Sequence, residues 1–191
     1  MDNGRTFQYK WFDLALLSVL AVISEFMGSG LLSVWNSDFY FSFTIAVSLI
    51  AMIRWGAVGA VVGMIGGIPG IMYSDMTVFG GILFYVLANA FLGIPMLLYG
   101  KRDRDMIAES PALLMVYVLI SHICLSVGKG IVIFFLTGEL TGAVDYFGAT
   151  FLITVIDLIV CLVLRMRKGL ICDMRNYFIQ GEGEQNEEYR N

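Results

Sequence analysis

The strongest constraint on this chain is the spacing of its charged residues, which leaves six apolar stretches of nearly membrane-spanning length. A transmembrane helix needs about 20 mostly apolar residues. The chain is 58% hydrophobic and 15% charged, whereas about a quarter of the residues in a soluble domain are charged. We therefore predict an all-α integral membrane protein, a bundle of six transmembrane helices over the stretches 11–35, 39–53, 56–73, 78–99, 112–136 and 143–164.

The second and third stretches are separated only by Arg54 and Trp55. A single helix over residues 39–73 would be too long for one crossing, and it would bury Arg54 near the middle of the bilayer at a high cost in free energy. Two helices joined by a tight turn avoid both problems. We therefore expect a short second helix and a separate third helix.

The basic residues test this arrangement. Apart from Lys129, every Lys and Arg falls before the first stretch, between the second and third, between the fourth and fifth, or after the sixth. The remaining three loops carry Asp38, Asp75 and Glu139 instead. Because basic loops stay in the cytoplasm, the pattern predicts that both termini are cytoplasmic, and that the protein is a multi-pass protein of the cell membrane.

Three regions follow from this topology. Residues 1–10 form a polar cytoplasmic N-terminus, residues 11–168 form the transmembrane domain, and residues 169–191 form a polar, acidic cytoplasmic tail that we expect to be partly disordered. Cys124 and Cys161 lie in apolar stretches without CxxC spacing, so they are interpreted as small buried side chains. The sequence gives no indication of a metal site, a cofactor, nucleic-acid binding or a catalytic residue set. It also lacks the GxxxxGK[ST] loop of nucleotide-binding proteins.

Lys129 is the most informative single residue, because it lies inside the fifth stretch. An ionisable side chain at membrane depth indicates a functional site by default. His122 and Ser126 lie on the same predicted helix face. Lys129 could bind a ligand, or it could pair with Glu25, which lies at a similar depth in the first stretch. The two alternatives are compatible, because such a pair can open to admit a substrate.

Polar residues in two other stretches extend this prediction. In the sixth stretch Tyr146, Thr150, Thr154 and Asp157 recur at spacings that place them on one helix face, which should point inward. Asp157 lies in the inner half, where it can serve as a structural partner of another helix. The fourth stretch adds Tyr85 and Asn89. We predict a small-molecule site on the outer side, built by Glu25, Tyr85, Asn89, Ser126, Lys129, Tyr146 and Thr150.

The third stretch is rich in glycine. Three pairs have GxxxG spacing, namely Gly59 with Gly63, Gly63 with Gly67 and Gly66 with Gly70. Small residues let helix backbones approach closely in lipid. We interpret this pattern as a packing face inside the bundle.

The segments "FSFTIAVSLIAMIRWGAVGAVVGMIGGIPG" and "YVLANAFLG", together with the six-stretch pattern, carry a family resemblance. Over about residues 11–168 the chain resembles the substrate-binding S components of energy-coupling factor (ECF) transporters, the bacterial importers of vitamins and micronutrients. The resemblance implies capture of a vitamin-like or other small metabolite at the outer side of the membrane. It also implies two kinds of partner, a membrane coupling subunit and two ATPase subunits that drive import.

The family docks to its coupling subunit through small residues of the first helix. In this chain the corresponding small residues are Ala15, Ser18, Ala21 and Ser24, which recur every three positions instead of every four. The resemblance assigns docking to these four residues. Two alternatives from other classes are a membrane scaffold or accessory protein of the cell-envelope machinery and a small membrane enzyme.

Overall fold

A computed structural model describes residues 3–32, 42–99, 103–167 and 170–174 of the chain. Most of the predicted tail over 169–191, and the loop that contains Asp38, lie outside the described residues. Every regular element in the described part is helical, as predicted. Five apolar runs are long enough to cross a membrane, and they span Thr6–Ser29, Thr44–Met72, Val78–Leu98, Pro111–Thr137 and Gly142–Arg165.

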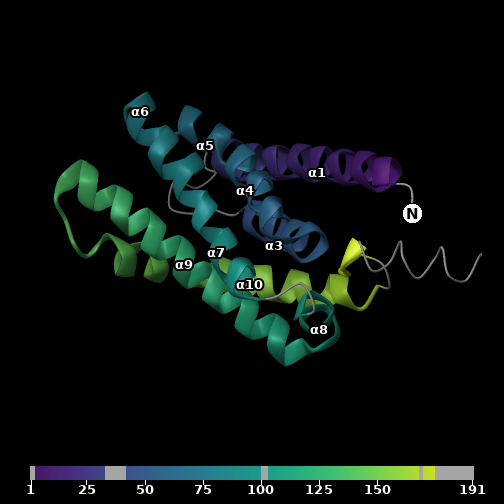
Figure 1. The fold of residues 1–191 in the computed structure, drawn as a ribbon. Helices are drawn as coiled ribbons and strands as arrows, with labels where there is room; N and C mark the ends of the chain where they lie inside the picture. The colour runs from purple at the N-terminus through teal and green to yellow at the C-terminus, as the bar shows by residue number, and fades with distance from the viewer. Residues whose placement is uncertain (1–2, 33–41, 100–102, 168–169, 175–191) are drawn as a thin grey trace, which may run out of the picture.

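The elements follow one another along the chain as shown in Figure 1. Two of the long runs are continuous helices and the other three change helix type along their length. The elements are α1 (Asn3–Glu25), η1 (Phe26–Leu32), α3 (Thr44–Trp55), η2 (Gly56–Gly59), α4 (Ala60–Gly66), α5 (Ile68–Met72), α6 (Val78–Gly81), η3 (Ile82–Leu87), η4 (Ala88–Gly93), α7 (Ile94–Leu98), α8 (Asp103–Glu109), α9 (Pro111–Thr137) and α10 (Gly142–Arg165).

The run Thr44–Met72 folds back on itself at Gly56. This glycine has a φ of +76°, which side chains with a Cβ rarely adopt. After the turn, Gly59 lies against the backbone of Ala51 and Gly63 lies against Ser48, so α4 runs antiparallel to α3. At 1.5 Å per residue the 12 residues of α3 rise about 18 Å, less than the roughly 30 Å of the hydrocarbon core.

Glycines bring the helices around α4 into close contact. A Cβ built on Gly66 would lie 2.8 Å from the Ala21 Cβ of α1, and one on Gly67 would lie 1.8 Å from the Tyr85 carbonyl oxygen of η3. Only a residue without a Cβ permits such distances. The predicted glycine-rich packing face therefore contacts α1 and α3 on one side and η3 on the other.

The helices α9 and α10 form a long antiparallel hairpin. Ser110 caps the start of α9 by accepting a hydrogen bond from the Leu113 N–H at 3.4 Å, and Pro111 occupies the first turn. Gly138 ends α9 in the left-handed conformation, with a φ of +81°. Close packing continues at the turn, where Gly130 faces Ala143.

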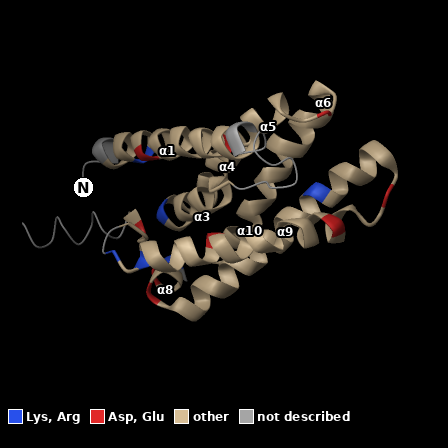
Figure 2. Cartoon of the chain, turned by 180° about the vertical axis from the view of Figure 1, so that it is seen from behind, with Lys and Arg blue, Asp and Glu red and all other residues tan. Residues whose placement is uncertain are grey.

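Most of the basic residues that the structure describes gather at one end of the bundle, which also holds the start of α1, the turn at Gly56, and α8 (Figure 2). Arg54 pairs with Asp13 of α1 at 2.8 Å, and Arg104 of α8 pairs with Asp173 at 2.8 Å. Arg165, at the end of α10, donates to the carbonyl oxygen of Ala108 at 2.9 Å. These contacts join the ends of α1, α3, α8 and α10 into one charged layer.

The surface between the two ends is apolar. Large hydrophobic side chains are exposed along the outer faces of the long helices, including Leu16 and Val19 of α1, Leu119 of α9 and Leu152 of α10. A soluble monomer rarely exposes contiguous apolar surface on this scale. The surface is suited to contact with lipid, in agreement with the composition.

Candidate functional site

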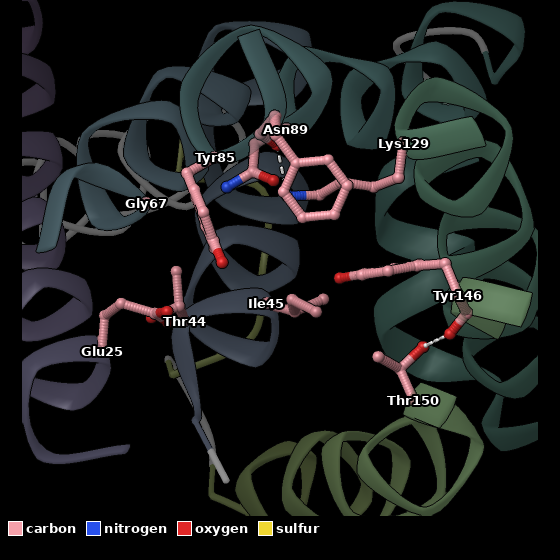
Figure 3. A pocket seen from close by; sticks show the side chains of 10 residues that line it. Glu25, Thr44, Ile45, Gly67, Tyr85, Asn89, Lys129, Tyr146 and Thr150 are labelled. Atoms are coloured by element: carbon pink, nitrogen blue, oxygen red, sulfur yellow. Dashed lines mark hydrogen bonds between the residues drawn. The ribbon is translucent and has the colours of Figure 1, made fainter. Parts of the chain in front are cut away.

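A cavity of about 160 Å³ is lined by residues of α1, α3, η3, η4, α9 and α10, and Figure 3 shows the side chains around it. It lies toward the end opposite the charged layer. Six of the seven predicted site residues line it, so sequence positions as distant as 25 and 150 meet in one place. The lining residues are Glu25, Thr44, Ile45, Gly67, Phe84, Tyr85, Asn89, Lys129, Tyr146 and Thr150.

Lys129 reaches the cavity from α9, and only 3% of the residue is exposed. Its Nζ donates a hydrogen bond to the carbonyl oxygen of Phe84. Three aromatic rings surround the amine, with ring centroids 4.0 Å away for Phe84, 5.0 Å for Tyr85 and 5.6 Å for Tyr146. Aromatic faces stabilise a cation where water is excluded, which explains how the bundle accommodates a basic side chain at this depth.

Glu25 ends α1 on the opposite side of the cavity (Figure 3), and it is also 3% exposed. It accepts a hydrogen bond from the Ser42 hydroxyl at 2.7 Å. The ion pairs between described residues join Arg54 to Asp13, Arg104 to Asp173, and His122 to Asp157. A Lys129–Glu25 ion pair is not among these pairs of described residues, and the two groups face each other across the cavity.

Irregular helix geometry positions the residues of the fourth apolar run. The π-helical segment η3 carries Phe84 and Tyr85, and the 3₁₀ segment η4 carries Asn89. Phe84 and Tyr85, which are adjacent in the sequence, both line the cavity. A second π segment, η1, follows Glu25. Interruptions of this kind are frequent at functional sites.

Asn89 has two roles. Its amide nitrogen donates to the carbonyl oxygen of Gly63 at 2.8 Å, which attaches η4 to α4, and the residue also lines the cavity. Asn89 is therefore both an interhelical contact and a cavity residue.

The α10 wall consists of Tyr146 and Thr150, one turn apart. The Thr150 hydroxyl donates to the Tyr146 carbonyl oxygen at 2.8 Å. The Tyr146 ring packs edge-to-face on Phe84, with centroids 5.8 Å apart, and its hydroxyl points into the cavity (Figure 3). This confirms that Tyr146 and Thr150, the N-terminal part of the predicted polar face of α10, point into the bundle.

Ser126 is the predicted site residue that does not line the cavity. It is buried, and its hydroxyl donates to the His122 carbonyl oxygen of its own helix at 2.8 Å. The sequence analysis also missed four lining residues, namely Thr44, Ile45, Gly67 and Phe84. For Phe84 the adjacent Tyr85 was a signal, although an apolar residue in an apolar stretch does not stand out.

The predicted docking residues of α1 do not form an exposed stripe. Ala21 is fully buried against Gly66, Ser18 is buried, and Ser24 accepts a hydrogen bond from the Phe43 N–H at 2.7 Å. Ala15 is exposed. Because an α-helix turns by about 100° per residue, a three-residue spacing drifts around the helix. In the isolated chain Ser18 and Ala21 are buried, Ser24 is partly buried and Ala15 is exposed, and docking through these residues stays a prediction.

The arrangement can hold a small dipolar molecule. The cavity presents a basic group on one wall, a carboxyl group on the other, and two phenol hydroxyls between them (Figure 3). Its size is near that of a cavity that admits one benzene ring. Within the described part of the chain no cluster of three or more His, Cys, Asp or Glu side chains could hold a metal ion.

Comparisons with known proteins identify no relative. No family model matches the chain, and no curated protein or solved structure matches it.

Proposed function

We propose that this protein is the substrate-binding S component of an ECF-type importer and that it captures a small molecule in the cavity between α1, η3, α9 and α10. The observation that carries the proposal is the meeting of Lys129 and Glu25 on opposite walls of a buried cavity. Buried ionisable groups are costly in a membrane protein and are commonly kept for a function.

The cavity also defines the kind of ligand. A volume of about 160 Å³ admits a molecule of roughly one ring, and the two charged walls favour a dipolar molecule with an anionic or electron-rich group toward Lys129. The rings of Phe84, Tyr85 and Tyr146 suit a flat or aromatic body. A small, ring-containing metabolite fits these properties.

The proposed topology has six membrane crossings with both termini in the cytoplasm. The antiparallel turn at Gly56 supports two crossings within the run Thr44–Met72, and the gathering of basic residues at one end supports the orientation (Figure 2). Single cysteines test it in a chain without its native cysteines. An impermeant thiol reagent applied to intact cells should label positions 75 and 141. Labelling of position 103 from outside would refute this topology.

The proposed partners are a membrane coupling subunit and two ATPases. The motivation is the lack of a nucleotide-binding loop in the sequence, so an energy source has to come from other chains. Affinity purification from the native membrane should recover an ATPase pair together with this protein, and the isolated chain should not hydrolyse ATP. Recovery of cell-envelope proteins without any ATPase would instead favour the scaffold alternative.

Lys129 provides the sharpest test of the site. Native mass spectrometry of protein purified from its source should reveal a small bound molecule, which can then be released by denaturation and used as the probe. Lys129→Ala should weaken binding of that molecule at least tenfold, which corresponds to about 1.4 kcal/mol. Lys129→Arg should not restore it fully, because guanidinium is larger and planar. A folded Lys129→Ala protein with unchanged affinity would show that Lys129 is structural.

A further inference from the structure

A second buried polar cluster lies outside the cavity, between α9 and α10. His122 Nε2 lies 3.2 Å from Asp157 Oδ2, and the two side chains are 1% and 0% exposed. The other ring nitrogen, Nδ1, lies 3.0 Å from Thr154 Oγ1. Neither carboxyl oxygen of Asp157 has an aligned hydrogen bond in the described structure. A carboxyl group and an imidazole thus face each other inside the helices that cross the membrane.

The hydrogen bonds of Thr154 fix one hydrogen of the imidazole. Its hydroxyl donates its single proton to the Thr150 carbonyl oxygen at 3.0 Å. The tautomer that satisfies both contacts at once is the one in which Nδ1 carries a hydrogen and donates it to the Thr154 hydroxyl. The proton balance of the cluster is then decided between His122 Nε2 and Asp157 Oδ2.

Charge determines that balance. Without a proton between Nε2 and Oδ2, two lone pairs would face each other and the cluster would carry a full negative charge. With a proton on each, it would carry a full positive charge. Either net charge is costly in a medium of low dielectric constant. One shared proton makes the cluster neutral, whether the proton lies nearer to the nitrogen or to the oxygen.

Among the described residues, the groups that act on Asp157 include no Lys or Arg side chain. On α9 the hydroxyls of Tyr117 and Ser121 are buried and lie close to each other. From α10, Cys161 and Tyr146 lie within electrostatic range of Asp157. From α3 the backbone at Ala46 faces the carboxyl group, and residues 44–53 include no titratable side chain.

The cluster is also connected to the cavity along α10. Thr154 donates to the Thr150 carbonyl oxygen, and Thr150 donates to the Tyr146 carbonyl oxygen. Thr150 and Tyr146 both line the cavity. The histidine therefore lies at the inner end of a row of polar groups whose outer end is the cavity wall.

We propose that His122 and Asp157 form a protonation site, which holds one proton in the membrane interior and contacts the cavity wall through Thr154. The proposal does not depend on the import function, because it concerns a cluster that lies outside the cavity. Its consequence is that the polar contact between His122 of α9 and Asp157 of α10 contains a bound proton.

The single histidine of the chain makes the test direct. The full chain, labelled with ¹⁵N-histidine in lipid nanodiscs, gives the signals of one imidazole. The Nδ1 signal should be that of a nitrogen that carries a hydrogen, and the Nε2 signal should depart from that of an ordinary neutral imidazole. An Nε2 signal identical to that of an ordinary neutral imidazole would overturn the proposal.

Two variants separate the two sides of the ring. Asp157→Asn removes the partner of the shared proton, so the Nε2 signal should move to that of an ordinary neutral imidazole while the Nδ1 signal stays. Thr154→Val removes the other partner, so the Nδ1 signal should move while the Nε2 signal stays. An unchanged Nε2 signal in folded Asp157→Asn protein would contradict a shared proton. If that variant does not fold, the wild-type signals and Thr154→Val still decide the question.

Discussion

The hairpin α9–α10 and the segment from α4 to α7 line the same cavity with different kinds of backbone. α9 runs for 27 residues and α10 for 24 residues without a change of helix type. The run Val78–Leu98, which is shorter, passes from α-helix through π-helix and 3₁₀-helix and back to α-helix. Both regions are apolar and long enough to cross a membrane, so hydrophobicity does not explain the difference.

The difference lies in what each region contributes to the site. The regular hairpin supplies side chains at helical spacing, namely Lys129 from α9 and Tyr146 and Thr150 from α10. The irregular segment supplies two adjacent aromatic residues, Phe84 and Tyr85, and the backbone carbonyl oxygen that accepts the Lys129 hydrogen bond.

Close packing against α4 stabilises the irregular segment, and Gly67→Ala should have the largest effect of the changes considered. Its Cβ would lie 1.8 Å from the Tyr85 carbonyl oxygen, so the backbone of η3 would have to move. We expect a loss of stability at or above the upper end of the roughly 1–3 kcal/mol that overpacking costs. The midpoint of thermal unfolding in detergent measures it.

Gly148 in α10 is the matched control, because a Cβ there would meet no atom within 4 Å. Gly148→Ala should leave the unfolding midpoint unchanged or raise it slightly, since alanine favours a helix by about 1 kcal/mol over glycine. Equal losses of stability in the two variants would mean that close backbone contact does not distinguish the two regions.

The sequence made the site largely predictable for one physical reason. Polar and ionisable side chains are costly in lipid, so those inside apolar stretches have to face the interior. This reasoning selected Glu25, Asn89 and Lys129, which line one cavity in the structure. It could not select Phe84 or Ile45, because an apolar residue is equally at home facing lipid, the core or a cavity.

The limits of the fold prediction have a similar origin. The apolar stretches and the turn near Arg54 could be recognised from charge and length alone. The changes of helix type in η3 and η4 could not, because charge and length are the same for an α-, π- or 3₁₀-helical segment. Burial of Ser18 and Ala21 could not be read from the sequence either, because small residues serve packing inside the bundle as readily as contact with a partner.

The contact between α1 and Gly66 allows a second test, for which we expect an effect of intermediate size. Ala21→Leu places a large side chain where Ala21 is fully buried beside Gly66, and we expect a loss of about 1–3 kcal/mol. Ala15→Leu adds the same side chain at an exposed position of the same helix and should change stability by less than about 0.5 kcal/mol. Thermal unfolding of the two proteins side by side measures the difference. A greater loss from Ala15→Leu would show that the faces of α1 have been assigned the wrong way round.

The smallest expected effect concerns the aromatic rings around Lys129, where α9 contacts η3. Phe84→Leu keeps the backbone carbonyl oxygen that accepts the Lys129 hydrogen bond, but it removes the ring centred 4.0 Å from Nζ. A cation–π contact contributes about 0.5–2 kcal/mol, so the unfolding midpoint should fall modestly. Phe135→Leu is the control, because Phe135 is 78% exposed on α9 and the change should have little effect.

Loss of packing at Phe84 could lower the midpoint without any role for the cation, and a double-mutant cycle separates the two causes. Phe84→Leu is measured again in a Lys129→Met background, which keeps an apolar chain of similar length but removes the charged group. If the ring stabilises the cation, Phe84→Leu should cost about 0.5–2 kcal/mol less in that background than in the wild type. Equal costs in both backgrounds would show that Phe84 acts by packing alone. The contact between Lys129 of α9 and η3 would then rest on the carbonyl oxygen of Phe84 and not on its ring.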